Sequence, residues 1–393
     1  MAKLSSSNGL EKFPKLRFPG FDEPYKQCRI GDIYAERSQR GASNMELLSV
    51  TMNDGVKPRS EIEGKDNSSE DKSNYKIVRK GDMVYNSMRM WQGANGISPC
   101  DGIVSPAYTV LMPKQEINNG YFAALFKSAN LINEFRKNSQ GMTSDTWNLK
   151  YPQIETIKIQ IPSVSEQDKV SELFGVLDAR IVAQAQLIEA LKKYKRGLLM
   201  HFFSDDITRQ WRQYTISQIG KVITGNTPPT NDRSNYDGDL MFCSPRDIGE
   251  QKYISSTEKR VSPKGFALGR QIPPSSVIVT CIGLIGKLGI ATTDMITNQQ
   301  INALIVSEDF DHEFIYYAFE NFFPKYRSKV SMQTLPILSK SEFEKLLIKV
   351  PDLNVQHKIS NYLAGMDKRI EQTQQELNVI QDLRRGIIQK LFI

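Results

Sequence analysis

Two stretches of this 393-residue chain start in the same way: IPSVSEQDKV at residues 161–170 and VPDLNVQHKI at residues 350–359. Each has an apolar residue, a proline, a short polar run, a glutamine, a lysine and a branched apolar residue. Pro351 follows Pro162 by 189 residues, and this offset aligns 42 positions without a gap. A match this long with so large a period indicates an internal duplication rather than a short-repeat solenoid. The identical pairs are Pro162/Pro351, Gln167/Gln356, Lys169/Lys358, Ser171/Ser360, Asp178/Asp367, Arg180/Arg369, Ile181/Ile370, Gln186/Gln375, Arg196/Arg385, Gly197/Gly386 and Phe203/Phe392.

Both copies carry apolar residues at alternating spacings of three and four, which predicts one long helix in 161–204 and another in 351–393. Polar residues interrupt the two stripes at matching places, Gln184 with Thr373 and Lys195 with Arg384. Each helix could pack on the core of its own domain. We expect instead an intramolecular antiparallel pair, about 55 Å long. The predicted apolar seam comprises Val170, Phe174, Leu177, Ile181, Ile188, Leu191, Leu198, Ile359, Leu363, Met366, Ile370, Leu377, Ile380 and Ile387.

The segments before the two helices repeat more loosely. RIGDI at 29–33 resembles TISQIG at 215–220, and KGDMVYNSM at 80–88 resembles SSVIVTCIG at 275–283. Strand-like runs, helical runs and turns rich in Gly, Pro and Asn alternate in both segments. The sequence therefore predicts an α+β fold with pseudo-twofold symmetry. Two similar mixed α/β domains, 1–160 and 205–350, would be separated by two long helices that form an antiparallel coiled coil.

Composition limits the class of protein. The chain has 51 Lys and Arg against 44 Asp and Glu, a net charge of +7 that suits a nucleic-acid partner. The most apolar run, at 277–291, is interrupted by Lys287 and is too short to span a bilayer, so we expect no membrane association. The four cysteines are scattered without a CxxC pair, which predicts neither a zinc site nor disulfides and favours the cytoplasm.

Motifs for catalysis are weak. GLIGKLG at 283–289 lacks the spacing and the hydroxyl of a phosphate-binding loop, and no GxGxxG motif occurs. The three histidines lie far apart in the sequence. Glu250 and Lys252 form a nuclease-like fragment, but Asp247 is poorly spaced to complete a metal site with them. We therefore predict no catalytic residue and no metal site.

Several loops carry side chains that suit the recognition of bases in the major groove. Arginine pairs with guanine through two hydrogen bonds, and Asn or Gln pairs in the same way with adenine. For any single residue, a solvated loop or a buried turn is a simpler explanation than contact with a base. The predicted DNA-binding residues are Asn86, Arg89, Trp91, Gln92, Ser105, Tyr108, Arg246, Lys287, Asn298, Gln299, Gln300, Gln333 and Thr334.

Over its whole length the chain resembles the specificity subunit of a type I restriction–modification system. The resemblance is carried by IQIPSVSEQDKV at 159–170, LKKYKRGLLMHFF at 191–203, IKVPDLNVQHKI at 348–359 and DLRRGIIQKLF at 382–392. FPKLRFPGF at 13–21 is also similar to this family. One departure is His357, which stands where the first copy has Asp168.

The resemblance implies a non-catalytic subunit without cofactors of its own. It would bind double-stranded DNA, and each of two target-recognition domains, 1–160 and 205–350, would recognise half of a bipartite site. The helix pair would hold two methylation subunits, which use S-adenosylmethionine to modify adenine N6. Restriction subunits would use ATP and magnesium to translocate and cut DNA. The alternatives are a stand-alone bipartite DNA-binding regulator without enzymatic partners and, less favoured, a magnesium-dependent nuclease.

Overall fold

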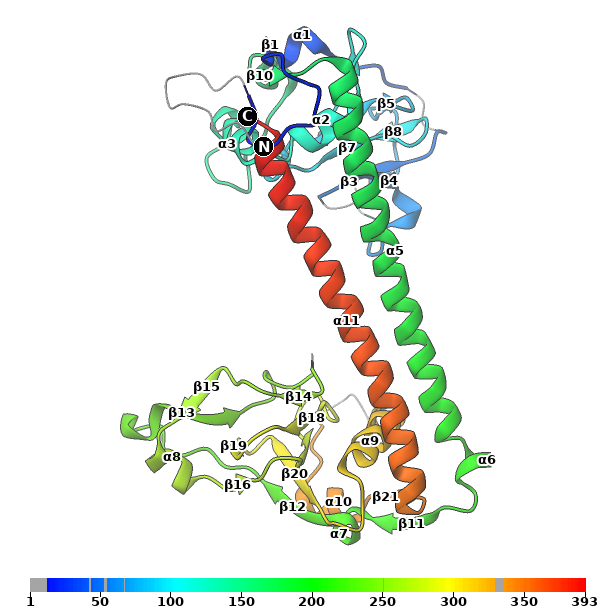
Figure 1. The fold of residues 1–393 in the computed structure, drawn as a ribbon, viewed down its shortest axis with the longest axis vertical. Helices are drawn as coiled ribbons and strands as arrows, with labels where there is room; N and C mark the ends of the chain where they lie inside the picture. Colours follow the sequence, from blue (N-terminus) through cyan, green and yellow to red (C-terminus); the bar gives the residue numbers. More distant parts are fainter. Residues whose placement is uncertain (1–12, 42–43, 53–54, 67, 250, 329–335) are drawn as a thin grey trace. The chain divides into compact units, whose positions relative to one another are not determined.

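The computed structural model describes residues 13–41, 44–52, 55–66, 68–249, 251–328 and 336–393. The chain forms two compact units (Figure 1). Unit 1 comprises Met1–Ala185 and Gln374–Ile393, and unit 2 comprises Gln186–Thr373. Two helices of 39 residues each, α5 (Val164–Phe202) and α11 (Leu353–Leu391), contribute one end to each unit. Each unit is therefore one globular part together with the adjoining halves of both long helices.

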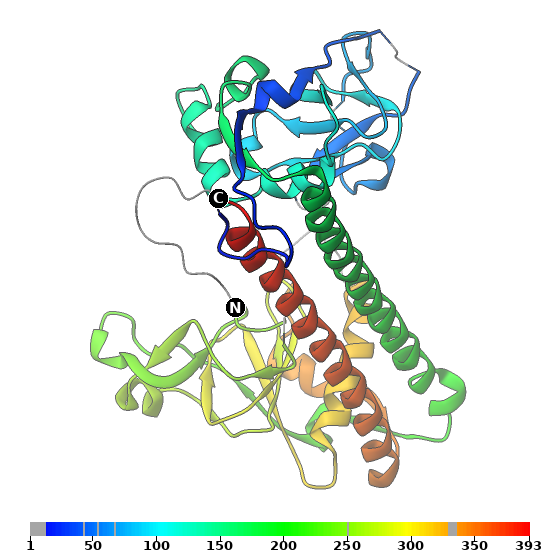
Figure 2. The ribbon, with the colours of Figure 1, turned by 45° about the horizontal axis from the view of Figure 1, so that its top comes forward.

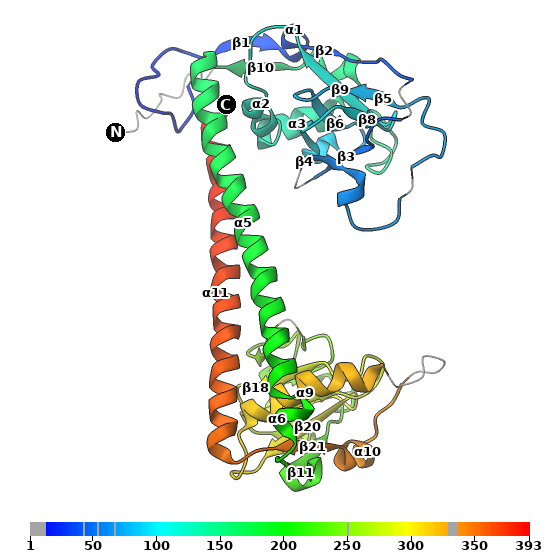
Figure 3. The same ribbon diagram turned by 90° about the vertical axis from the view of Figure 1, so that its right-hand side faces the viewer.

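Unit 1 is built on a four-stranded antiparallel sheet with three two-stranded ladders (Figure 3). The sheet has the order β2 (Tyr34–Glu36), β9 (Tyr108–Pro113), β6 (Met83–Asn86) and β7 (Asn95–Ile97). The ladders pair β1 (Lys26–Arg29) with β10 (Lys158–Ile161), β3 (Leu48–Thr51) with β4 (Gly55–Pro58), and β5 (Lys76–Val78) with β8 (Gly102–Val104). The helices are α1 (Ile30–Ile33), η1 (Arg59–Glu61), η2 (Met90–Gln92), α2 (Asn119–Leu125), α3 (Ala129–Asn138) and α4 (Tyr151–Ile154).

Unit 2 contains a five-stranded and a four-stranded sheet. The first has the order β12 (Gly220–Thr224), β20 (Ile301–Val306), β17 (Val277–Thr280), β18 (Leu288–Ala291) and β14 (Tyr253–Ile254). The second has the order β15 (Lys259–Val261), β13 (Tyr236–Cys243), β19 (Met295–Thr297) and β16 (Gln271–Ile272), and β11 (Arg212–Thr215) pairs separately with β21 (Leu347–Val350). The helices are α6 (Asp205–Thr208), α7 (Ile216–Ile219), η3 (Arg233–Asn235), α8 (Pro263–Leu268), α9 (His312–Arg327) and α10 (Lys340–Lys345).

The duplicated glutamine joins each globular part to its long helix. The Gln167 side chain accepts a hydrogen bond from the backbone N–H of Asn118 at 3.0 Å and donates to the Pro162 carbonyl at 3.1 Å. The Gln356 side chain accepts from the N–H of Asp311 at 2.9 Å and donates to the Pro351 carbonyl at 2.9 Å. These two amides are only 1% and 2% exposed.

Asn118 and Asp311 are the N-caps of α2 and α9, which contribute buried residues to the cores of the two globular parts. The spacing between proline and glutamine in the repeated motif therefore lets one glutamine side chain bond both to the proline before the long helix and to the N-cap of α2 or α9. Because both amide groups are buried, each must be hydrogen-bonded to avoid a desolvation penalty.

The long helices run antiparallel and pack against each other (Figure 2). In unit 1, Arg384 on α11 donates to both carboxylate oxygens of Asp178 on α5. In unit 2, Lys195 on α5 lies 2.7 Å from the carboxylate of Asp367 on α11. Lys195 and Arg384 are equivalent in the repeat, and so are Asp178 and Asp367. Two of the polar interruptions in the apolar stripes are thus the basic partners of two repeated ion pairs.

The long helices both pack on the globular cores and pair with each other, so the two arrangements inferred from the sequence occur together. Val170 and Phe174 of α5 belong to the core of unit 1, which also contains Phe392, stacked on Phe174 with ring centroids 6.1 Å apart. Leu199 of α5 and Leu363 of α11 belong to the core of unit 2. The helix ends therefore complete the globular cores while the helices also pair with each other.

The apolar residues predicted for the seam are all buried or half-buried, as expected for an inward-facing stripe. Direct packing of each one against the opposite helix stays a prediction. The buried ones are Val170, Phe174, Ile188, Ile359, Leu363, Leu377 and Ile380, and the half-buried ones are Leu177, Ile181, Leu191, Leu198, Met366, Ile370 and Ile387.

The two repeated ion pairs should contribute unequally to stability. Asp367 is 26% exposed and also accepts from the Tyr317 hydroxyl at 2.6 Å, whereas Asp178 is 52% exposed. We expect Asp367→Ala to lower the free energy of unfolding by about 3 kcal/mol, because it removes one partner of a largely buried pair. Asp178→Ala should cost about 1 kcal/mol or less. Urea denaturation of both variants measures the difference, and equal costs would contradict it.

The buried glutamine can be tested in the same way. Gln356→Leu keeps the size of the side chain but leaves the N–H of Asp311 and the carbonyl of Pro351 without their partner. We expect a loss of about 1–3 kcal/mol in the free energy of unfolding. Gln213→Leu, at an exposed position of β11, is the control and should be near neutral. A neutral Gln356→Leu variant would show that the joint does not depend on the amide.

Candidate nucleic-acid interface

Three loops converge beside a central strand in each unit, through the same backbone hydrogen bonds. In unit 1, the N–H of Ser87 donates to the Ala107 carbonyl at 3.2 Å, and the N–H of Leu149 donates to the Ser87 carbonyl at 2.8 Å. We call the loops 86–94, 105–107 and 140–149 junction 1.

In unit 2, the N–H of Cys281 donates to the Gln300 carbonyl at 2.7 Å, and the N–H of Leu338 donates to the Cys281 carbonyl at 2.8 Å. We call the loops 281–287, 298–300 and 336–338, together with the loop 244–249 to which Lys287 bonds, junction 2. Ser87 follows β6 directly as Cys281 follows β17, and these two strands lie in the stretches whose sequences resemble each other. The duplication therefore extends from the long helices to the loop framework of the globular parts.

Junction 1 brings together all six DNA-binding residues predicted in the first globular part. Asn86, Arg89, Trp91 and Gln92 lie on its first loop, and Ser105 and Tyr108 lie on or beside its second loop.

The first loop of junction 1 is held by its own hydrogen bonds. The Asn86 side chain accepts from the N–H of Met88 at 3.0 Å, and the Trp91 indole donates to the Met88 carbonyl at 3.1 Å. Trp91 also packs edge to face on Trp147 of the third loop, with ring centroids 5.2 Å apart. The loop that carries Arg89 is therefore fixed at both sides.

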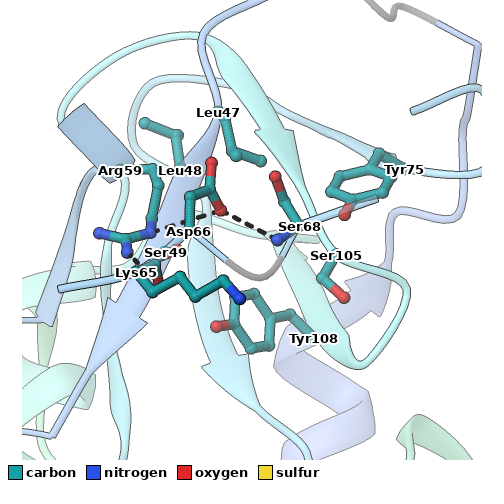
Figure 4. Close-up of a pocket in the computed structure, with 10 residues that line it drawn as sticks. All are labelled: Leu47, Leu48, Ser49, Arg59, Lys65, Asp66, Ser68, Tyr75, Ser105 and Tyr108. Atoms are coloured by element: carbon teal, nitrogen blue, oxygen red, sulfur yellow. Dashed lines mark hydrogen bonds and ion pairs between the residues drawn. The ribbon is translucent and has the colours of Figure 1, made fainter. Parts of the chain in front are cut away.

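A polar pocket of about 260 Å³ lies beside the second loop of junction 1 (Figure 4). Ser105 and Tyr108 line it, together with Arg59, Lys65 and others. The Arg59 guanidinium donates to the carbonyls of Gly64 and Lys65 at 2.9 and 2.8 Å and holds this part of the rim in place. Arg59 and Lys65 are not among the residues predicted from the sequence, because they lie in a long polar stretch in which no single basic residue is distinctive.

The loop 298–300 of junction 2 connects β19 of the second sheet of unit 2 to β20 of the first. Strands β13 and β19 are parallel, with Cys243 opposite Thr297 at their carboxyl ends, so the loops that follow leave the same edge. The N–H of Asn298 donates to the Cys243 carbonyl at 3.0 Å. The loop 244–249, which carries Arg246 and to which Lys287 bonds, therefore starts beside the loop 298–300.

The amide side chains at this edge are partly engaged with one another. The Asn298 side chain donates to that of Gln300 at 3.1 Å, and the Gln299 carbonyl oxygen accepts from the Thr227 hydroxyl at 2.7 Å. Gln299 is exposed, and its amide NH2 has no acceptor within the described part of the chain. Gln333 and Thr334 lie outside the described residues, so their placement stays a prediction.

Arg246 lies on the loop 244–249, which closes on itself. The Asp247 carboxylate accepts from the N–H and the hydroxyl of Ser244, both at 2.8 Å, and from the N–H of Glu258 at 2.7 Å. The Arg246 side chain is 85% exposed, with Glu258 as its ion-pair partner at 3.9 Å. The loop thus presents a guanidinium to solvent on a well-defined backbone.

Lys287 is engaged inside the unit. Its ammonium donates to the carbonyls of Pro245 and Ile248, at 3.2 and 2.8 Å, and so bonds to the backbone on both sides of Arg246. Direct contact of Lys287 with DNA stays a prediction, although two of its three donors are already used.

The chemistry of the described residues gives no active site to the nuclease alternative. Lys252 donates to Glu313 and to the Tyr317 hydroxyl, and Glu250 lies outside the described residues. Burial raises the pKa of the Cys281 thiol to about 12, so this thiol is protonated and a poor nucleophile at neutral pH. Within the described ranges, no cluster of three His, Cys, Asp or Glu side chains is placed to hold a metal ion.

None of the described helices is both long and apolar enough to cross a bilayer.

The family model for the type I restriction modification DNA specificity domain matches the chain twice, over residues 23–193 and 208–382. A similar curated protein is the type I restriction enzyme HindI specificity subunit of Haemophilus influenzae. It is 21% identical over 319 residues, which cover 61% of this chain and 70% of that protein.

Two solved structures share the fold. One, described as the structural basis underlying complex assembly and conformational transition of the type I R-M system, has a TM-score of 0.62 at 16% identity. It covers 96% of this chain and 99% of its own. The other is the S subunit of a type I restriction-modification system from M. genitalium. Its TM-score is 0.60 at 15% identity, and it covers 97% of this chain and 99% of its own.

Each match of the family model spans one globular part and most of the long helix that follows it, and together the two matches cover most of the chain. The predicted α+β fold, with two similar domains and long helices packed together, is thereby confirmed. The chain belongs to the type I restriction–modification DNA specificity family, and it is a non-catalytic specificity subunit with two target-recognition domains.

Proposed function

We propose that this subunit recognises a bipartite double-stranded DNA target, with junction 1 contacting one half-site and junction 2 the other. The observation that carries the proposal is the pair of equivalent backbone frameworks, in which Ser87 and Cys281 each join three loops. The proposed recognition domains are 1–160 and 205–350, and 161–204 and 351–393 are the connecting helices. A repeated framework with different side chains suits the recognition of two different short sequences.

The exposed polar groups of the junctions match the donors and acceptors of base edges. Arg246 can donate two hydrogen bonds to guanine, and the free amide of Gln299 suits adenine. The Arg89 guanidinium has no hydrogen-bond or ion-pair partner among the described residues, and it lies on a loop fixed by Trp91 and Asn86. We propose Arg89 and Arg246 as the main base-contacting residues of the two domains. The other predicted junction residues, apart from Lys287, would contact bases or phosphates around them.

We further propose that the helix pair binds two methylation subunits, which use S-adenosylmethionine to methylate adenine N6. Restriction subunits would join the complex and use ATP and magnesium. The repeated sequence of the two helices supports the binding of two copies of one partner, since equivalent surfaces recur on α5 and α11. A subunit with these partners would act on DNA in the cytoplasm.

Exchange of one recognition domain tests whether the two half-sites are recognised independently. Residues 205–350 are replaced by the corresponding segment of another specificity subunit, and N6-methyladenine is mapped across the host genome. We expect one half of the methylated sequence to change and the other to persist, because each junction is completed within its own unit. A change in both halves would contradict independent recognition. Sequence-specific binding by the subunit alone, undiminished without methylation subunits, would favour the stand-alone regulator.

Single arginine variants test the assignment of each junction to one half-site. Arg89→Ala and Arg246→Ala should each lose about 1–3 kcal/mol of discrimination at one base pair, in different half-sites. Competition binding with duplexes substituted at single positions measures this loss. Arg209→Ala is the control, since it removes an exposed arginine of unit 2 that pairs with Asp206 rather than with a junction loop. If both variants relaxed the same half-site, the assignment would be wrong.

A further inference from the structure

We infer that Lys287 is a positioning residue for target recognition: it fixes the loop 244–249 so that Arg246 meets its base in one orientation. The inference rests on the proposed function of junction 2. The sequence alone suggested that Lys287 itself contacts DNA, whereas its ammonium bonds to the carbonyls of Pro245 and Ile248. These two carbonyls flank Arg246 and the carboxylate-bearing Asp247, so one cation holds both arms of the loop.

The backbone of Lys287 is itself held in place by hydrogen bonds. The backbone N–H of Lys287 donates to the Thr280 hydroxyl at 2.9 Å, and its carbonyl accepts from the N–H of Thr280 at 3.0 Å. Thr280 ends β17 and is fully buried. The ammonium therefore extends from a rigid pair of strands to a loop that lies outside both sheets.

The loop has a shape that fits the lysine closely. Gly249 has a positive φ of 122°, which favours glycine, and a Cβ built there would lie 3.4 Å from Cε of Lys287. Glycine at this position therefore serves the turn, and the lysine stem packs in ordinary van der Waals contact beside it. Asp247 closes the other side of the loop through Ser244 and Glu258.

The Lys287 ammonium and the Asp247 carboxylate bond to different parts of the loop that carries Arg246. Without the lysine, the backbone at Pro245 and Ile248 loses its connection to β18, and Arg246 can adopt more orientations in the free protein. Ordering it on binding then costs entropy that a fixed loop does not lose. The loss should fall on the contact that needs two well-aligned hydrogen bonds, and less on contacts with phosphate.

The experiment uses the complete subunit assembled with its methylation subunits and the target sequence mapped in the host. Lys287→Met, Lys287→Arg, Arg246→Ala and the double variant Lys287→Met/Arg246→Ala are compared. For each, affinities for the target and for duplexes substituted at every position give the discrimination, and their salt dependence and the melting temperature are also measured. Lys264→Met is the matched control, because this lysine bonds to Asp232 and Ser234 rather than to a junction loop.

We expect Lys287→Met to lose roughly tenfold in discrimination at the base pair that Arg246→Ala relaxes, and at no other. The double variant should lose no more than Arg246→Ala alone, because Lys287 acts through Arg246. The salt dependence should match the wild type, and Lys287→Arg should restore part of the discrimination. Should Lys287→Met fail to fold, Asp247→Ala loosens the same loop from its other side and should relax the same base pair.

Other outcomes would overturn the inference. Additive losses together with a salt slope reduced by about one would mean that Lys287 binds a phosphate directly. If Lys287→Met weakened the binding of all DNA sequences equally and lowered the melting temperature, Lys287 would have a role in folding alone. If Arg246→Ala changed discrimination at no base pair, Lys287 could not act through Arg246. A wild-type complex without sequence preference would instead contradict the proposed function itself, which separates the two failures.

Discussion

The buried amides of Gln167 and Gln356 are the constraint on which both units depend. Each amide connects the proline that ends a globular part, the start of a long helix and the N-cap of a helix in the core. A buried amide without a hydrogen-bond partner lowers the stability of the fold, so these hydrogen bonds fix the positions of the three elements relative to one another. The first and last strands of each globular part also pair just before this joint, β1 with β10 and β11 with β21. Each globular part is thus closed and attached to its helix at the same place.

From this joint the two units diverge in how they fasten the core to the helices. Unit 1 uses Arg17, which bonds to the buried Glu166 of α5, with the Tyr25 hydroxyl on the same carboxylate. Unit 2 adds Glu320 of α9 to the repeated ion pair, so that Lys195 lies between the carboxylates of Asp367 and Glu320 at 2.7 and 2.9 Å. Burial raises the pKa of Glu320, while the nearby ammonium opposes that shift. The duplicated helices therefore carry a common scaffold with a separate set of buried charges in each unit.

The two junctions likewise share a backbone arrangement and differ in their side chains. The backbone bonds at Ser87 and Cys281 are equivalent, while the side chains around them differ. Junction 1 presents Arg89 beside two packed indoles, and junction 2 presents Arg246 on a loop that Asp247 and Lys287 hold. A shared backbone frame lets side chains change without loss of the fold, because the frame is made by groups that every residue type except proline supplies. This property suits a protein family in which two similar domains recognise different sequences.

The sequence by itself determined the order of parts and the two long helices, because heptad spacing and a duplicated motif are local patterns repeated over many residues. It also located the residues that meet in junction 1, since four of them are neighbours in the chain. It could not show that Lys195 and Arg384 find acidic partners on the opposite helix, or that Lys287 bonds to the backbone beside Arg246. Those roles depend on which groups approach within about 3 Å after distant strands and helices have packed. Only the tertiary structure decides this, because a lysine that binds phosphate and one that binds a carbonyl have the same side chain.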